Sequence, residues 1–174
     1  MKNKIIFTLL LITQIGFGQI KTNYLEENIL TNQLLIQGKT IEDIEATSGD
    51  NSKMISLFGN GLIRTIESSL EGFILIYQTD GLKFVFAKSN DTDSIFYLNY
   101  IKVISSEIDI QFKGKNVSVD KSIDILADSS KSYYENEYFI NYKIDSPINM
   151  GLLINYNKTS NNILSIEFSQ ELDN

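Results

Sequence analysis

The 174-residue chain contains neither histidine nor cysteine. Histidine supplies the general base of Ser-His-Asp and Cys-His catalysis, cysteine supplies the nucleophile of the latter, and both supply ligands of zinc sites. Their absence excludes both forms of nucleophilic catalysis and the usual zinc sites. The glycine-rich patterns GxGxxG and GxxxxGK[ST], which hold phosphates, are also missing. The sequence therefore predicts no cofactor.

Two short patterns resemble chemical motifs. Ser118 and Lys121 have the S-x-x-K spacing of Ser-Lys catalysis, but the companion motifs are absent, so Ser118 is interpreted as a helix cap. Asp91 and Asp93 in SNDTDS resemble the start of a calcium loop. Ile95 stands where that loop needs a third ligand, so the stretch is interpreted as a hairpin loop.

Paired carboxylates are the remaining catalytic option. Glycoside hydrolases use two acids that face each other across roughly 5–10 Å. With 22 Asp and Glu residues in the chain, no particular pair is singled out. Arg64 is the only arginine, so the chain has few groups that could bind a phosphate or carboxylate through paired hydrogen bonds. We predict no catalytic, cofactor-binding or metal-binding residue.

The stretch SYYENEYFINY at Ser132–Tyr142 combines aromatic and acidic residues. Tyrosines carry a large apolar ring and a polar tip, and they are enriched at protein interfaces. With glutamates between them, they would suit a basic protein partner. In the alternative interpretation, alternate tyrosines face the core. The predicted partner-binding residues are Tyr133, Tyr134, Glu135, Glu137 and Tyr138.

The N-terminal sequence MKNKIIFTLLLITQIGFGQ has the features of a secretory signal peptide. Lys2 and Lys4 precede an apolar run, and the small residues Gly16 and Gly18 predict cleavage between Gly18 and Gln19. A transmembrane anchor, the alternative, needs about 20 apolar residues, and polar residues interrupt this run too early. The sequence therefore predicts an exported protein, periplasmic or extracellular, without a stable membrane anchor.

Charge and composition narrow the class of partner. Removal of the predicted leader would change the formal net charge from −7 to −9. An acidic surface repels nucleic acid and anionic membranes. In the absence of disulfides, stability must come from burial, and 43% of the residues are hydrophobic. Another protein is the expected partner.

Periodicity predicts a similar order of elements in each half of the chain. Gly-Lys turns at Gly38 and Gly114 each follow an apolar stretch, and a short helix signal comes next, around residues 54–58 and 123–127. The second helix would begin at a cap on Ser118 or Asp120. Three antiparallel strands then follow, and DGLKFVFAK at Asp80–Lys88 is matched by MGLLINYNK at Met150–Lys158.

This repeated order predicts an α+β fold of two similar small modules, each an antiparallel sheet with one short helix, packed into one unit. Chance similarity between β-rich stretches is the alternative. The predicted divisions are listed from the N-terminus: signal peptide 1–18, N-terminal arm 19–32, first module 33–106, second module 107–170 and tail 171–174. The sheet face opposite the helices would be free to meet a partner.

At the level of architecture, the chain resembles the secreted β-lactamase inhibitor proteins, which contain tandem helix-plus-antiparallel-sheet modules. Single modules of this kind occur in small outer-membrane assembly lipoproteins. The resemblance is carried by SLFGNG at Ser56–Gly61, YQTDGLKFVF at Tyr77–Phe86 and MGLLINY at Met150–Tyr156, within residues 33–170. The inhibitors carry disulfides and the lipoproteins a lipidated cysteine, whereas this chain has no cysteine. The resemblance implies this architecture and a habit of binding proteins.

Three functions follow from these observations. The first is a non-catalytic, exported protein-binding module of an inhibitor or immunity type. The second is a carboxylate-based hydrolase, and the third is a carrier of a small apolar ligand. The missing histidine and cysteine favour the first over the second, and the small space inside such sheets weighs against the third.

Overall fold

A computed structural model describes residues 20–69, 72–88, 95–144 and 149–170. The predicted signal peptide, the SNDTDS stretch with Asp91 and Asp93, and the tail 171–174 lie outside these ranges. Among the described residues, no helix has both the length and the apolar character needed to cross a membrane.

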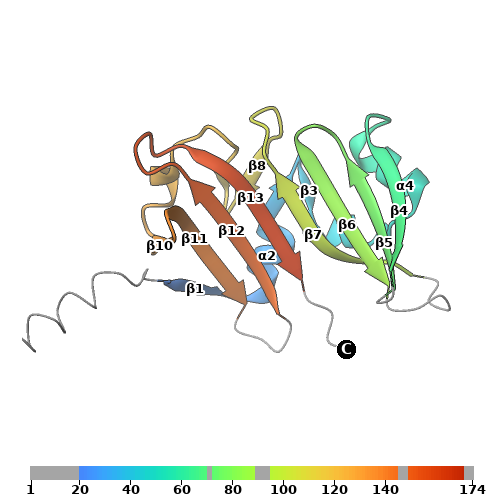
Figure 1. Cartoon of the computed structure of the whole chain (residues 1–174), viewed down its shortest axis with the longest axis horizontal. Helices are drawn as coiled ribbons and strands as arrows, with labels where there is room; N and C mark the ends of the chain where they lie inside the picture. The colour runs from blue at the N-terminus through green and yellow to red at the C-terminus, as the bar shows by residue number, and fades with distance from the viewer. Residues whose placement is uncertain (1–19, 70–71, 89–94, 145–148, 171–174) are drawn as a thin grey trace, which may run out of the picture.

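A long sheet forms the body of the molecule (Figure 1). Its strands, in spatial order, are β4 (Ile63–Ser69), β5 (Gly72–Gln78), β6 (Leu82–Lys88), β7 (Tyr97–Val103), β13 (Ile163–Gln170), β12 (Met150–Tyr156) and β11 (Glu137–Ile144). These seven strands pair antiparallel. Two short strands, β10 (Ser132–Tyr134) and β1 (Thr22–Leu25), share the outer edge of β11, where β10 is antiparallel and β1 parallel.

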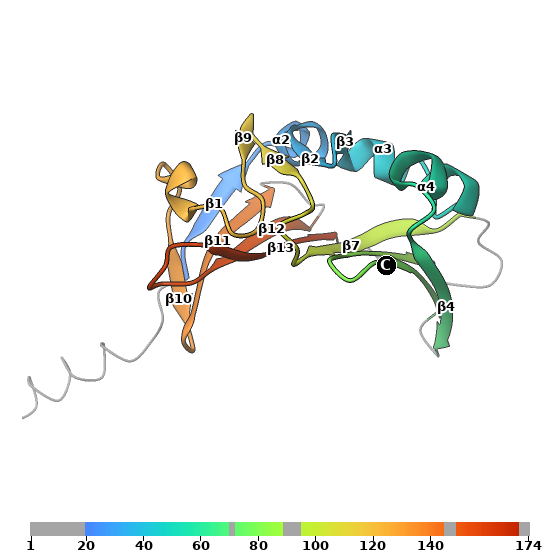
Figure 2. The ribbon, with the colours of Figure 1, turned by 90° about the horizontal axis from the view of Figure 1, so that it is seen from above.

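A second layer covers one face of this sheet (Figure 2). It contains a small sheet in the order β3 (Lys39–Thr40), β2 (Leu34–Ile36), β8 (Ile110–Phe112), β9 (Lys115–Asn116). The helices are α2 (Glu27–Gln33), α3 (Ile41–Glu45), α4 (Asn51–Phe58) and the 3-10 turn η1 (Ile123–Leu126). The main sheet is curved, and β4 and the β10–β11 hairpin both turn away from this layer.

The hydrophobic core lies between the two layers and runs the length of the molecule. Alternate residues of the strands point into it, as in β12, where Met150, Leu152, Ile154 and Tyr156 are buried. The largest fully buried side chains are Tyr77, Tyr142, Phe84, Phe86, Phe112 and Phe168. One cluster joins the small sheet, the helices and most strands of the main sheet, so burial alone can hold this disulfide-free chain together.

Local signals explain the helix in the first half. The Asp50 carboxylate accepts a hydrogen bond from the Lys53 N–H at 2.9 Å and caps α4. The helix ends at Gly59, whose φ of 81° suits glycine. A helix that the sequence analysis missed, α3, begins with a capping box in which Thr40 and Asp43 exchange hydrogen bonds.

The predicted helix of the second half is much shorter than expected. It is the 3-10 turn η1, capped by Ser122 and not by Ser118 or Asp120. Asp120 has a φ of 66°, in the left-handed region, whereas an N-cap residue typically has an extended backbone, as Ser122 does. The Ser118 hydroxyl instead accepts a hydrogen bond from the Ile110 N–H at 2.8 Å, so it supports the start of β8. The interpretation of Ser118 as a helix cap was therefore wrong.

The remaining differences are elements that the predicted order did not include. The N-terminal arm contains β1 and α2, and a further strand precedes the three expected in each half, β4 in one and β10 in the other. The predicted boundary at residues 106 and 107 falls in the connection between β7 and β8. Both sheets contain strands from each side of this boundary, so each sheet continues across it. The chain as described is mostly β structure with few helices.

Candidate functional site

The face of the main sheet opposite the helices is the candidate site, and we call it the open face. Strand pairing places its side chains in rows across the sheet, because directly paired residues point to the same side. One row contains Gln78, Lys83, Lys102, Glu167, Leu153 and Asn141. The next contains Thr65, Ile76, Val85, Tyr100, Ser169, Gly151, Lys143 and Tyr24.

The two ends of the open face differ in chemistry. Over β5 and β6, apolar side chains predominate: Ile74, Val85 and Ala87 are partly exposed, and Ile76 between them is buried. Over β11, β12 and β13, amide and hydroxyl groups are common: Asn141, Asn155, Ser165 and Ser169. A surface with both an apolar and a polar section can provide burial energy and hydrogen-bond specificity to one partner.

Glu167 lies at the junction between these sections. Its carboxylate accepts a hydrogen bond from the Tyr100 hydroxyl at 2.7 Å, and the Lys102 ammonium lies 3.0 Å away. Ser165 donates to the same carboxylate at 3.4 Å, and Asn155 donates to Ser165 at 2.9 Å. These contacts link β7, β13 and β12 in one polar network on the open face.

The network controls the ionisation of its members. Burial alone would raise the pKa of Glu167, but the hydrogen bonds from Tyr100 and Lys102 outweigh burial and hold that pKa below its ordinary value. Burial and the adjacent carboxylate raise the pKa of Tyr100 far above its ordinary value. At neutral pH the network therefore holds an ionised carboxylate and a neutral phenol.

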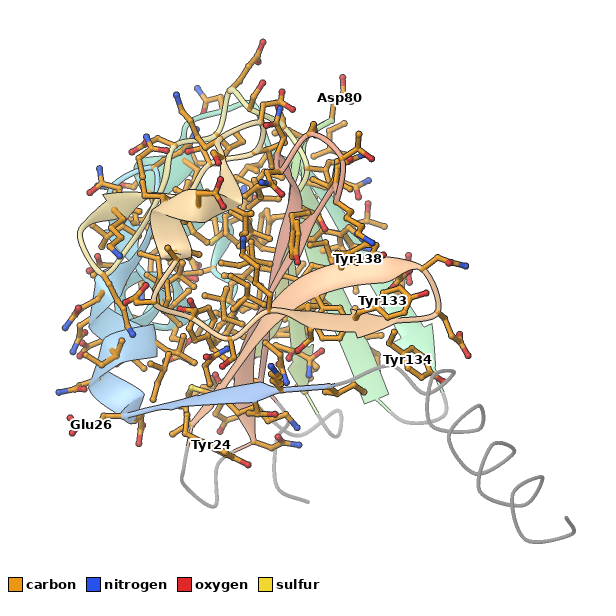
Figure 3. The ribbon with its side chains drawn as sticks, turned by 90° about the vertical axis from the view of Figure 1, so that its left-hand side faces the viewer. Tyr24, Glu26, Asp80, Tyr133, Tyr134 and Tyr138 are labelled. Carbon is orange, nitrogen blue, oxygen red and sulfur yellow. The ribbon has the colours of Figure 1, made fainter. Side chains whose placement is uncertain are left out.

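The predicted partner-binding residues lie on the β10–β11 hairpin (Figure 3). Its two turn residues, Glu135 and Asn136, both have positive φ, 47° and 73°, as in the tight turns that match the twist of paired strands. Tyr133 and Tyr134 are 39% and 47% exposed, and both glutamates are exposed. The structure therefore brings all five predicted residues together on one protruding hairpin.

The hairpin tyrosines divide between its two sides. Tyr133 pairs with Tyr138, on the side facing the helices, with their ring centroids 4.8 Å apart, and Tyr138 is partly buried against the core. Tyr134 pairs with Glu137, so both point to the open-face side. Of the tyrosines in the stretch, Tyr142 is buried and only 1% exposed. Tyr134 and Glu137 are thus the predicted residues best placed to extend the open face.

A lysine lies beside the tyrosine stack. The Lys158 Nζ is 5.0 Å from the ring centroid of Tyr138, a cation–π geometry. The hydrogen bond with the Tyr138 hydroxyl raises the pKa of Lys158. Acidic residues at the hairpin tip therefore lie near a basic residue, Lys158, from the segment that follows β12, and this arrangement can discriminate among charged partners.

A hollow of about 400 Å³ adjoins the turn end of this hairpin. Its lining residues are Asn136, Glu137, Tyr138, Asn155, Tyr156, Asn157, Lys158, Thr159, Leu164 and Ser165. Glu137 is the single carboxylate in that lining, and the rest are mostly amides, hydroxyls and rings. Groups of this kind can accept hydrogen bonds and apolar contacts from an inserted side chain of a partner.

The other motifs lie elsewhere. Ser118 is buried at 3% exposure under β8, whereas Lys121 is exposed. Arg64 is exposed on β4. In the part of the chain that the structure describes, no three His, Cys, Asp or Glu residues are grouped so that they could hold a metal ion.

The sequence analysis missed the Tyr100–Lys102–Glu167 network. The alternation of Ile101 and Val103 with Tyr100 and Lys102 could have shown that these polar residues share the outer face of β7. It could not have shown that β7 lies next to β13, because the hydrogen-bonded Tyr100 and Glu167 are 67 residues apart.

Comparisons with known proteins leave the chain without an identified relative. No family model, no curated protein and no solved structure matches it. The architectural resemblance to the β-lactamase inhibitor proteins therefore stays a prediction.

Proposed function

We propose that this protein is an exported, non-catalytic protein-binding module that engages its partner through the open face and the adjoining β10–β11 hairpin. One observation carries the proposal: the helices and the small sheet cover one face of the main sheet, and the strands curve away from that layer (Figure 2). The partly exposed groups of the open face combine apolar area with ordered polar groups, as interfaces do.

The hairpin indicates the kind of partner. Tyr134, Glu135 and Glu137 provide one exposed ring and two carboxylates at the tip, in a chain of formal net charge −7. A partner with a basic patch would gain contact area from the ring and faster association from the charge. We therefore propose a basic protein as the partner, and an inhibitor or immunity type of action.

We further infer that the two halves of the chain are copies of one module. The strand pairings that join the two halves support this inference. When each residue of such a pair is replaced by its counterpart in the other half, another observed pair results. In the small sheet, Leu34 pairs with Phe112 and Ile36 with Ile110; between β7 and β13, Ile101 pairs with Phe168 and Val103 with Ile166. Equivalent positions across a two-fold axis would produce these reciprocal pairs.

The hydrolase and the carrier remain alternatives without a specific observation in their favour. The hollow at the hairpin has one carboxylate in its lining, whereas glycoside hydrolysis uses two. Its lining mixes polar and apolar groups in similar proportion, whereas a carrier of apolar ligands needs a predominantly apolar pocket.

The experiment is capture of partners from a secreted or periplasmic fraction by the immobilised chain, followed by measurement of affinity for the captured protein. Changing both Tyr133 and Tyr134 to Ala should weaken the affinity about tenfold or more, the range of interface hot spots. The melting temperature should change little, because both rings are exposed.

Ile125→Ala is the matched control, because Ile125 is an exposed apolar residue (37%) on η1, in the helical layer. It should leave the affinity unchanged. Equal affinities of the double variant and the parent would count against the hairpin as a binding element. Hydrolysis of the captured partner or a glycan by the chain would favour the enzyme alternative.

A further inference from the structure

Strand β4 ends the main sheet, and within the described residues no strand lies on its outer edge (Figure 1). Every residue from Ile63 to Ser68 is exposed, and the side chains of Ile63 and Ile66 reach 64% and 52% exposure. A long edge strand with exposed apolar residues, and with neither proline nor bulge, is a template for pairing with another chain. At the opposite end of the sheet, the edge of β11 is covered by β10 and β1.

The hydrogen-bond pattern shows which backbone groups of β4 point outward. The Thr79 N–H donates to the Leu82 carbonyl at 2.8 Å. Because the direction of the backbone N–H and C=O groups alternates along a strand, the backbone groups of each second residue before Thr79 in β5 also point toward β6. The intervening residues of β5, from Gly72 to Gln78, face β4. Their partners are Ile63, Thr65, Glu67 and Ser69. The backbone N–H and C=O groups of Arg64, Ile66 and Ser68 therefore point away from the sheet.

We propose that β4 is a homodimer interface, at which two copies of the chain pair antiparallel about a two-fold axis through Ile66. In this register Ile66 lies opposite the Ile66 of the copy. Arg64 lies opposite Ser68, and Thr65 lies opposite Glu67. The three outward-pointing residues all gain backbone hydrogen bonds, and the two exposed Ile66 side chains cover each other.

Self-complementarity favours a second copy over a foreign strand. An interface about a two-fold axis needs one surface that fits itself, and this register places no two like charges opposite each other. A register centred on Thr65 is worse, because it would leave Ser68 opposite Leu62, which lies outside β4. It would also set Arg64 against Ile66.

The dimer goes beyond the proposed function and has a consequence for it. A two-fold axis perpendicular to the sheet keeps the open faces of both copies on one side of a continuous sheet. The two hairpins that carry Tyr134 would then lie at the far ends of this surface, since β4 and β10–β11 occupy opposite ends of each sheet.

Cysteine substitution tests this register directly, because the chain has no cysteine of its own. Paired residues that exchange backbone hydrogen bonds have Cα atoms about 5.5 Å apart, within the range of a disulfide. Ile66→Cys should therefore form a covalent dimer on mild oxidation. Ile63→Cys is the matched control: it faces Ser69 of the copy, the two introduced thiols would be about 20 Å apart, and no cross-link should form.

Sedimentation of the unmodified protein should show a concentration-dependent shift from the 19.8 kDa chain to twice that mass. Ile66→Lys should weaken dimerisation about tenfold or more, because two like charges would meet at the axis, and Ile63→Lys should have a much smaller effect. A monomer at every concentration, with no Ile66→Cys cross-link, would overturn the proposal. Cross-linking through Thr65→Cys in place of Ile66→Cys would overturn the register.

Discussion

At the scale of single residues, Glu167 shows how the open face holds a half-buried charge. Its side chain is 21% exposed, and its carboxylate is stabilised by Tyr100 and Lys102 on the neighbouring strand. Because these contacts lower its pKa, the folded protein binds a proton at Glu167 less readily than the unfolded chain does. This carboxylate therefore contributes stability above its ordinary pKa of 4.5, and the contribution is lost as pH falls through the lower pKa of the folded state.

Tyr100→Phe tests this network, because it removes the hydroxyl that donates to Glu167 and keeps the ring. We expect the free energy of unfolding at neutral pH to fall by about 1 kcal/mol, since the site is partly solvated. Parent and variant should converge in acid, once the pH falls below the lowered pKa of Glu167. Urea unfolding at the two pH values measures the difference. An equal loss at both would show that the hydroxyl does not act through the carboxylate. Tyr97→Phe, an exposed tyrosine of the same strand, is the control.

Residue types were enough to exclude classes of chemistry, but not to find this network. The absence of histidine and cysteine can be read directly from the sequence. The clustering of the five hairpin residues also follows from it, because they are neighbours in the chain. The contact between Tyr100 and Glu167 depends on the pairing of β7 with β13, and no local pattern specifies which distant strands become neighbours.

At the scale of elements, the glycines of the two matched segments, Gly81 and Gly151, occupy different surroundings. A Cβ on Gly81 would lie 2.1 Å from the Ser105 Cβ, in the connection that follows β7. A Cβ on Gly151 would meet only the Tyr142 carbonyl at 3.3 Å and the Ser169 Oγ at 3.8 Å. Glycine at residue 81 is therefore required by close packing, whereas residue 151 has room for a slight adjustment.

Gly81→Ala should lower the free energy of unfolding by about 1–3 kcal/mol, the range of overpacked sites. Gly151→Ala should cost less. Combining Gly81→Ala with Ser105→Gly should recover much of the loss, because the second change removes the clashing Cβ. Thermal melts of the three variants provide the measurement. If the double variant is no more stable than Gly81→Ala alone, contact with Ser105 is not the cause.

Elements with strong local signals were predictable. The cap at Asp50, the glycine at residue 59 and the alternation of the long strands all act within a few residues. The elements missed or mistaken were those that depend on distant contacts. Strand β1 exists because it pairs with β11, more than 100 residues away, and the Ser118 hydroxyl is used by the Ile110 N–H.

At the scale of the whole molecule, the two sheets bind the halves of the chain into one body. The main sheet crosses from one half to the other between β7 and β13, and the small sheet crosses between β2 and β8. The helical layer then covers one side of both halves and leaves the open face on the other (Figure 2). Hydrophobic alternation predicted the strands, but the one-sided cover follows only from where the helices pack.

The most direct measurement of the central claim compares the affinity of the captured partner for Val85→Lys and Ile125→Lys. Val85 lies in the apolar section of the open face, and Ile125 lies in the helical layer, so the same charge is placed on opposite sides. Our account predicts that Val85→Lys abolishes binding and that Ile125→Lys preserves it, with both variants folded. Full binding by Val85→Lys together with loss of binding by Ile125→Lys would contradict it.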